Sequence, residues 1–368
     1  MIYLDNNATT RPDPRVLDRV REVAEQCFGN PGSSHAAGRR ARQVLEDARE
    51  EVASLLGATP VGVVFTSGAT EASNLALYGL ARGRGVVAAT AGEHPATEEV
   101  LSRVHAEGWR RAEIPLDADS RIGGVADLPW EDVRLLTLIF AHNETGVVQD
   151  TSEVAALCER HRVPWHLDAT QAVGKVPVDF AGLGCTTLSF AAHKFHGPRG
   201  VGCLLVREGA TVHPRQFGGH QESGRRAGTE AVALAAGLAE ALRLAVEEMP
   251  EWTSRMRAAR DRLEAGLRTV APECVVHGAA AGRLPNTSCV GFPGRDGQAL
   301  VVALDLAGVC VSVGSACASG SPEPAPVLLA MGVPEGLARA SLRFSVSHET
   351  TAAEIDGAIS AAARVLSQ

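Results

Sequence analysis

The strongest constraint on the fold is an alternation of short apolar runs with longer amphipathic segments between about Arg15 and Glu248. The apolar runs are VGVVFTSG, GVVAAT, RLLTLIFAH, VPWHLDAT, TTLSFAAH and VGCLLVRE. Strands that are apolar on both faces and separated by helices are typical of a mainly parallel sheet with helices on both sides. We therefore expect an α/β fold, with a large domain over residues 13–248.

The order of predicted strands and helices changes after the large domain. After two long helical segments, the strand-like runs PNTSCVGF, GVCVSV and SLRFSV alternate with the helical runs GQALVVALDLA and AAEIDGAISAAARVL. This pattern predicts a smaller α+β domain. We expect it to comprise residues 249–368, joined by residues 1–12.

Composition argues against several classes of protein. The 368 residues carry a formal net charge of −8, and because Arg is interleaved with Asp and Glu, direct nucleic-acid binding is not expected. No apolar run approaches the roughly 20 residues of a membrane span, and MIYLDNNATT lacks the pattern of a signal peptide. The eight cysteines are scattered without a CxxC pair, so we expect reduced thiols in a cytoplasmic protein.

One cysteine has unusual neighbours. The stretch GSACASGS, residues 314–321, surrounds Cys317 with glycine, serine and alanine. A structural cysteine ordinarily packs among apolar side chains. This context therefore predicts a thiol that is presented for chemistry.

The stretch SFAAHKFHGPRGVG places His193 and Lys194 in a turn after a predicted strand. Ligands of open α/β sheets bind at the carboxyl ends of the strands, and lysine is the residue that forms Schiff bases. Lysine is rare here, since Lys175 and Lys194 are the only two in the chain. These features favour Lys194 as a cofactor-binding amine over a surface lysine.

Other motifs supply what pyridoxal phosphate (PLP) requires. TSGATEASN, with Thr70, predicts a strand, a glycine turn and a helix start that could bind a phosphate. HLDATQ puts Asp168 at a strand end, where it could pair with the pyridine nitrogen, and Gln171 three residues later could bond the ring oxygen. GEHPAT offers His94 as a partner for ring stacking.

In these motifs and their order the sequence resembles the NifS/IscS-type cysteine desulfurases, class V aminotransferase-like enzymes of PLP fold type I. The resemblance covers essentially the whole chain, and the long segment around Cys317 resembles the group I branch. The matching motifs are YLDNNATT, FGNPGSSH, FTSGATEASNLA, HNETGVVQD, HLDATQAVGK, AAHKFHGPRG, RRAGTE, NTSCVGF, GSACASGSPEPAPVLLAMG and SLRFSVS. The resemblance implies a seven-stranded sheet in the large domain and the catalytic cysteine in the small one.

The resemblance also implies roles for individual residues. Lys194 would bind PLP as a Schiff base and move protons, and His94 would stack on the ring. The remaining cofactor contacts would come from Asp168 at the pyridine nitrogen, Gln171 and Asn143 at the phenolate oxygen, Ala69, Thr70 and His193 at the phosphate, and Thr229 from a second subunit. Arg343 and Asn30 would bind the substrate carboxylate, since the fork of an arginine matches a carboxylate in two places.

The implied reaction converts L-cysteine to L-alanine and leaves the sulfur as a persulfide on Cys317. The expected partners are a sulfur-acceptor protein, in iron–sulfur cluster assembly or another thiolation pathway, and a second copy in a homodimer. No resident metal is expected, although Cys317 could contact an iron–sulfur cluster transiently.

The sequence departs from the family pattern at three positions. Ala191 stands where the family often has a phosphate-binding serine, His142 replaces an asparagine, and Val313 replaces a serine. The chain ends soon after the last predicted helix, whereas housekeeping members often carry a longer tail that docks an iron–sulfur scaffold. The sequence therefore leaves open which protein accepts the sulfur.

Three other functions remain as alternatives. A selenocysteine lyase or cysteine sulfinate desulfinase need not use Cys317 for the lytic step. A sulfur-carrier or scaffold protein could bind PLP and work through its surface. A metal protein could use His193 and His196, but that pair lacks the glutamate of an H-E-x-x-H motif.

Overall fold

The computed structural model describes residues 1–313 and 323–367, and its largest sheet has seven strands in the order β2-β8-β7-β6-β5-β3-β4. Their bounds are β2 (Val63–Thr66), β3 (Val86–Thr90), β4 (Arg110–Ile114), β5 (Val133–Ile139), β6 (Trp165–Asp168), β7 (Thr187–Ala191) and β8 (Gly202–Val206). All neighbouring pairs are parallel except those of β8, which is antiparallel to β2 and to β7. The predicted α/β class and the mainly parallel seven-stranded sheet are confirmed.

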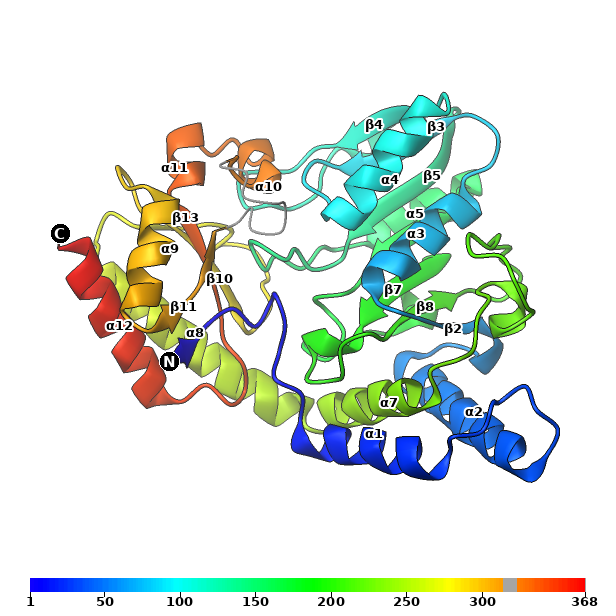
Figure 1. The fold of residues 1–368 in the computed structure, drawn as a ribbon. Helices are drawn as coiled ribbons and strands as arrows, with labels where there is room; N and C mark the ends of the chain where they lie inside the picture. The colour runs from blue at the N-terminus through cyan, green and yellow to red at the C-terminus, as the bar shows by residue number, and fades with distance from the viewer. Residues whose placement is uncertain (314–322, 368) are drawn as a thin grey trace.

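The alternating faces of the strands separate two apolar cores. Val64, Val87 and Leu204 pack in the core that includes α3 and α4, whereas Val63 and Leu205 belong to the core on the other face. The helices of this region are α1 (Pro14–Gln26), α2 (Ala36–Leu56), α3 (Ala69–Leu80), α4 (Pro95–Ala106), α5 (Ser152–His161), α6 (Phe180–Leu183) and α7 (Val232–Glu247). Figure 1 shows α3 and α4 together over the sheet, with α1, α2 and α7 packed against one another below it.

Strand β4 is the one large-sheet strand that the apolar runs did not predict. Its sequence, RRAEI, is largely exposed and ends in a single buried residue, Ile114. An edge strand pairs on one side only and can carry charged side chains. Apolar patterning therefore misses it.

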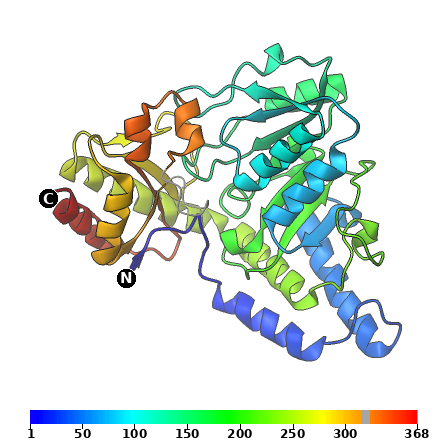
Figure 2. The same cartoon turned by 45° about the horizontal axis from the view of Figure 1, so that its top comes forward.

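Two smaller sheets lie beside the large one (Figure 2). One has the antiparallel order β12-β13-β10-β9, and in the other β1 pairs in parallel with β11. Their bounds are β1 (Ile2–Tyr3), β9 (Val275–Val276), β10 (Thr287–Gly291), β11 (Val309–Cys310), β12 (Ser312–Val313) and β13 (Ser341–Ser345). The accompanying helices are α8 (Met249–Val270), α9 (Gly297–Leu306), α10 (Pro326–Ala330), α11 (Glu335–Arg339) and α12 (Ala352–Leu366). The run GVCVSV, expected as one strand, is divided between the two sheets at Val311.

Residues 5–10, which we call the N-terminal strap, connect the two regions. Asn6 and Asn7 donate from their backbone amides to the carbonyl and hydroxyl of Ser345, at the end of β13. At its other end the strap binds the turn after β7, because Thr10 donates from its amide and hydroxyl to the carbonyl of His193. The strap therefore crosses from the small sheet to the carboxyl edge of the large one.

Among the described helices, none combines the length and the apolar character needed to cross a membrane.

Candidate active site

A cavity of about 620 Å³ opens at the carboxyl ends of the large-sheet strands, where the strap and β13 also arrive. This volume is within the usual range for a small-molecule site. The predicted site residues that line it are Ala69, Thr70, His94, Asn143, Asp168, Gln171, His193, Lys194 and Arg343. Asn30 and Thr229 do not line it, and Cys317 lies outside the described residues.

Lys194 ends the 3₁₀ turn η3 (Ala192–Lys194), which follows β7 directly. Its amine donates to two strap carbonyls, at 2.7 Å to Asn7 and 3.0 Å to Ala8. Because β8 runs back antiparallel to β7, Lys194 sits in the connection between two paired strands, directly after the end of β7.

Asp168 is the last residue of β6, next to β7 in the sheet, and its side chain is buried at the cavity. One carboxylate oxygen accepts from the backbone amide of Thr170 at 2.9 Å, which fixes its direction. Two residues earlier, buried His166 bonds Thr187 on the adjacent strand at 3.0 Å. Burial lowers the pKa of His166 to about 4, so this ring is neutral beneath the site.

The third element of the site is the N-terminus of α3. Strand β2 ends at Thr66, and Gly68 caps the helix. A Cβ on Gly68 would meet nothing within 4 Å, so the helix start borders open space. A Cβ on Gly202 would instead lie 2.6 Å from the backbone of Gly68, so β8 requires a glycine to approach this turn. Free amides at a helix N-terminus bind anions such as phosphate.

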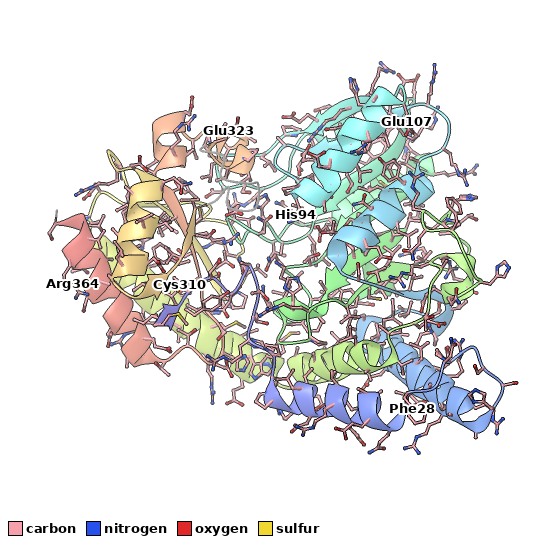
Figure 3. All side chains as sticks on the ribbon, in the orientation of Figure 1. Phe28, His94, Glu107, Cys310, Glu323 and Arg364 are labelled. Atoms are coloured by element: carbon pink, nitrogen blue, oxygen red, sulfur yellow. The ribbon has the colours of Figure 1, made fainter. Side chains whose placement is uncertain are left out.

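His94 caps the N-terminus of α4, at the edge of the large-sheet region that faces the smaller sheets (Figure 3). Its Nδ1 accepts from the backbone amide of Ala96 at 3.0 Å, so the proton of the neutral ring is on Nε2. Burial lowers the pKa of His94, which keeps the ring neutral at pH 7.

His142, one of the three residues that depart from the family pattern, supports the segment that leads to His94. Its Nδ1 accepts from the amide of Glu144 at 3.1 Å, so its Nε2 donates to the carbonyl of Gly92 at 3.0 Å. Burial lowers the pKa of His142 to about 4. A neutral histidine at this position therefore ties the loop before α4 to the loop that contains Asn143.

Arg343, on the central strand β13, is only 3% exposed. Its guanidinium donates to Glu144 at 2.9 Å and to Asp5 of the strap at 2.9 Å. A substrate carboxylate that binds Arg343 must therefore compete with two resident carboxylates. The side chain of Asp5 is 22% exposed and that of Glu144 is 8% exposed, so Asp5 is the easier one to displace.

Two site residues were missed by the sequence reading. Asn7 accepts four hydrogen bonds. Its backbone carbonyl accepts from Lys194 and Gln171. Its side-chain oxygen accepts from Asn286 and Lys175. Lys175 is buried and donates to Gln171 at 2.5 Å. The four-residue spacing of Gln171 and Lys175 was the available signal, because residues four apart share one face of a helical turn.

Asn30 lies away from the cavity in the connection between α1 and α2. It is exposed, and its side-chain oxygen accepts from the amide of Gly32 at 2.8 Å. Neighbouring Phe28 lies at the end of α1 remote from His94 (Figure 3). Thr229 is also exposed, in the connection between β8 and α7. The single chain thus does not bring either residue to the other predicted ones.

The position of Ala191 differs from what the family pattern suggests. Ala191 is fully buried and does not line the cavity. Ser189, two residues earlier, bonds the hydroxyl of Ser73 at 3.0 Å and also contacts His166, so it serves the interior of the sheet. Neither residue offers a hydroxyl to the cavity.

Metal ligation finds no support in the described part of the chain. No group of three or more His, Cys, Asp or Glu residues there could hold a metal ion. His193 bonds the hydroxyl of Thr9, whereas His196 bonds the carbonyl of Arg11 and lies against Trp252 and His348.

Together these features fit one kind of cofactor. A lysine amine can bind an aldehyde, a buried carboxylate can hold the proton of a ring nitrogen, and an open helix start can bind a phosphate. All three occur in one cavity, on residues from three strand ends. The nearby Glu71 does not oppose a phosphate as a free charge, because Arg226 binds it at 2.8 Å.

Comparisons with known proteins agree with this arrangement. The family model for class-V aminotransferases matches residues 2–357. A cysteine desulfurase of Enterobacter agglomerans is 43% identical over 364 residues, which cover 97% of this chain and 90% of that protein. The cysteine desulfurase NifS of Azotobacter vinelandii is 39% identical, with the same coverage of both chains. A solved NifS-like protein has a TM-score of 0.93 and 34% identity, covering 100% of this chain and 99% of its own. The chain therefore belongs to the class-V aminotransferase family and, within it, to the NifS-like cysteine desulfurases.

Proposed function

We propose that this chain is a PLP-dependent cysteine desulfurase, which converts L-cysteine to L-alanine and carries the sulfur as a persulfide on Cys317. The observation that best supports this function is the shared cavity of Lys194, Asp168 and Arg343. The lysine and the aspartate suit the cofactor, and the arginine suits the carboxylate of an amino acid.

PLP, when bound, supplies an electron sink that weakens bonds at the Cα and Cβ of an amino acid. Lys194 would hold it, with Asp168 at the ring nitrogen, Gln171 and Asn143 at the phenolate oxygen, and Ala69, Thr70 and His193 at the phosphate. His94 would stack on the ring.

The residues of the chain contribute binding and proton transfer. Arg343 binds the substrate carboxylate, which takes the place of Asp5 on the guanidinium. The Lys194 amine is suited to take and return protons at the substrate, and the Nε2–H of His94 to donate to a neighbouring atom. The Cys317 thiolate attacks the sulfur of L-cysteine. The carbon–sulfur bond breaks, a sulfur–sulfur bond forms on Cys317, and the substrate carbon takes up a proton to give alanine.

The proposal extends to partners and domain organisation. We propose a large PLP-binding domain of residues 13–248 and a small domain of residues 1–12 and 249–368 that presents Arg343 and Cys317. Phe28 is exposed in the same connection as Asn30, and Phe217 in the same connection as Thr229, and a second copy would cover both phenylalanines. Thr229 would then reach the site of that copy. The sulfur acceptor is a protein of iron–sulfur cluster assembly or another thiolation pathway.

The test uses purified protein loaded with PLP. L-cysteine is added, and alanine and persulfide are measured for the wild type, Cys317→Ala and the control Cys310→Ala. We expect alanine from the wild type and the control, and none from Cys317→Ala. Equal alanine from all three would instead indicate a selenocysteine lyase or sulfinate desulfinase. A protein that gains no visible absorption band with PLP would refute the function entirely.

A further inference from the structure

Lys175 is a buried lysine with no carboxylate partner among the described residues. It is 4% exposed, and its amine donates to two neutral groups, Gln171 Oε1 at 2.5 Å and Asn7 Oδ1 at 3.4 Å. Lysine is almost never fully buried unless it is paired with an acid. Burial, together with repulsion from Lys194 and Arg343, lowers the pKa of Lys175 well below its ordinary value. Burying this amine without an acid costs stability, so we expect a role for Lys175 in the neighbouring active site.

The local backbone brings Lys175 under the cavity. After β6 the chain makes a helical turn, in which the amides of Ala172 and Lys175 donate to the carbonyls of Ala169 and Ala172. Gly174 has a φ of 78°, and a Cβ there would lie 2.5 Å from the Cβ of Phe195. Only glycine fits this position, so Lys175 is turned back toward Gln171.

The contacts with Lys175 and with the carbonyl of Asn7 together orient the Gln171 amide. The Lys175 amine donates to the oxygen of the amide at 2.5 Å. The amide nitrogen then donates to the carbonyl of Asn7 at 2.9 Å. The same carbonyl accepts from the Lys194 amine at 2.7 Å. Two lysine amines are therefore linked through one glutamine and one strap residue.

We propose that Lys175 is a positioning residue of the active site, which holds the Gln171 amide nitrogen and the strap residue Asn7 toward Lys194. This inference rests on the proposed function, because Gln171 is there assigned to the phenolate oxygen of PLP. Without Lys175 the amide oxygen loses its donor, only the Asn7 carbonyl still orients the amide, and its nitrogen is held less well for donation to a phenolate. The phenolate then loses a charge-assisted hydrogen bond, and the protonated form of the bound cofactor gains in relative stability.

The experiment titrates the visible absorption band of the PLP-bound protein with pH, without substrate. Lys175→Met is compared with the wild type, and Arg260→Met is the matched control. Arg260 is likewise buried, but its hydrogen bonds go to Leu284, at 2.7 Å, and to Asp261, and not to Gln171 or the strap. We expect Lys175→Met to raise the titration midpoint by about one pH unit, the size of a charge-assisted hydrogen bond. Arg260→Met should lower the melting temperature and leave the midpoint unchanged.

A double variant tests whether Lys175 acts through Gln171. We expect Gln171→Ala to raise the midpoint, and Lys175→Met to add nothing further in that background. An additive shift would mean that Lys175 acts on Lys194 directly, and it would overturn the proposed relay. The other titratable or charged groups around the two amines are the same in every variant. They are His94, Asp168, His193, Arg199, Arg343 and Glu71 at the cavity, and Arg257, Arg283, His196 and His348 around Lys175.

Lys175→Gln covers the case in which the methionine variant does not fold. It places a neutral amide in the same space and should raise the midpoint by a smaller amount. An unchanged midpoint in whichever variant folds and binds PLP would overturn the inference. A wild type that fails to bind PLP would instead overturn the proposed function, so the two failures are distinguishable.

Discussion

The two walls of the cavity are built in different ways. The strand-end wall, formed by Gly68–Thr70, Asp168 and Lys194, follows strands whose side chains are buried in the apolar cores. The strap wall, formed by residues 7–9 of the strap and Arg343, is held by hydrogen bonds and ion pairs that involve polar side chains. One wall is positioned by sheet geometry, and the other by a polar network that must be satisfied as a whole.

The comparison predicts that the largest effect on catalysis comes from the strand-end wall. Lys194→Ala removes the only amine that this wall presents to the cavity in the described chain. We expect activity to fall by roughly 10³-fold or more, since both cofactor attachment and proton transfer are lost. The melting temperature should change little, because β7 and β8 keep their pairing and the Asn7 carbonyl keeps its hydrogen bond from Gln171. Alanine formation and thermal unfolding measure the two effects, and a large loss of stability would contradict the division of roles.

Substitution in the strap wall should instead lower stability strongly. Asn7→Ala removes the side chain that accepts from Asn286 and Lys175 and donates to Thr287 and to the carbonyl of Asn143. Leaving several buried polar groups unpaired should lower the free energy of unfolding by about 2–4 kcal/mol. Urea denaturation measures this loss. A stability equal to the wild type would show that the strap is not held by its polar network.

Arg343→Lys keeps a positive charge in the strap wall but removes the guanidinium, which can donate two parallel hydrogen bonds to one carboxylate. Glu144 and Asp5 retain a partner, so the fold should persist. The substrate carboxylate loses one of two hydrogen bonds, and KM for L-cysteine should rise about 10- to 100-fold, with a smaller change in kcat. Arg260→Lys, at a buried site outside the cavity, is the control and should leave KM unchanged. An unaltered KM in Arg343→Lys would assign carboxylate binding to another residue.

The smallest effect concerns a carboxyl behind the strand-end wall. Glu93 accepts from the hydroxyl of Thr90 and from the amide of Ile139 at 3.1 Å, and burial raises its pKa from 4.5 to about 8. The folded protein thus keeps a proton that the unfolded chain releases, and stability falls as pH rises from about 4.5 to about 8. Between pH 6 and pH 8 this loss should be about 2 kcal/mol. In Glu93→Gln, which mimics the neutral acid, that loss should disappear, as urea denaturation at the two pH values can measure.

The two walls also differ in how far the sequence predicts them. The strand-end residues Thr70, Asp168 and Lys194 each follow an apolar run directly, so local patterning predicts their position at one edge of the sheet. Arg343 was found by the family resemblance. The contacts of the strap wall join residues that are hundreds of positions apart, and no local pattern reveals that Asp5 and Glu144 share Arg343.

Two other features that the sequence did not predict, strand β4 and the burial of Lys175, have physical causes of the same kind. Strand β4 is stabilised by pairing at a sheet edge, which leaves its sequence polar. Lys175 is buried without an acid, against the usual preference of lysine for the surface. In both cases the tertiary environment overrides the average behaviour of the residue type.

The strap has a consequence for how the protein is made. The amide of Asn7 and its acceptor in Ser345 are separated by 338 positions in the sequence. During synthesis the first residues leave the ribosome early and domains tend to fold in order of emergence. Strands β7 and β8 can pair as soon as both have emerged, and Lys194 then already stands in its turn. The strap can bind its acceptors only after β13 has emerged, so the catalytic cavity is completed much later than the turn that contains Lys194.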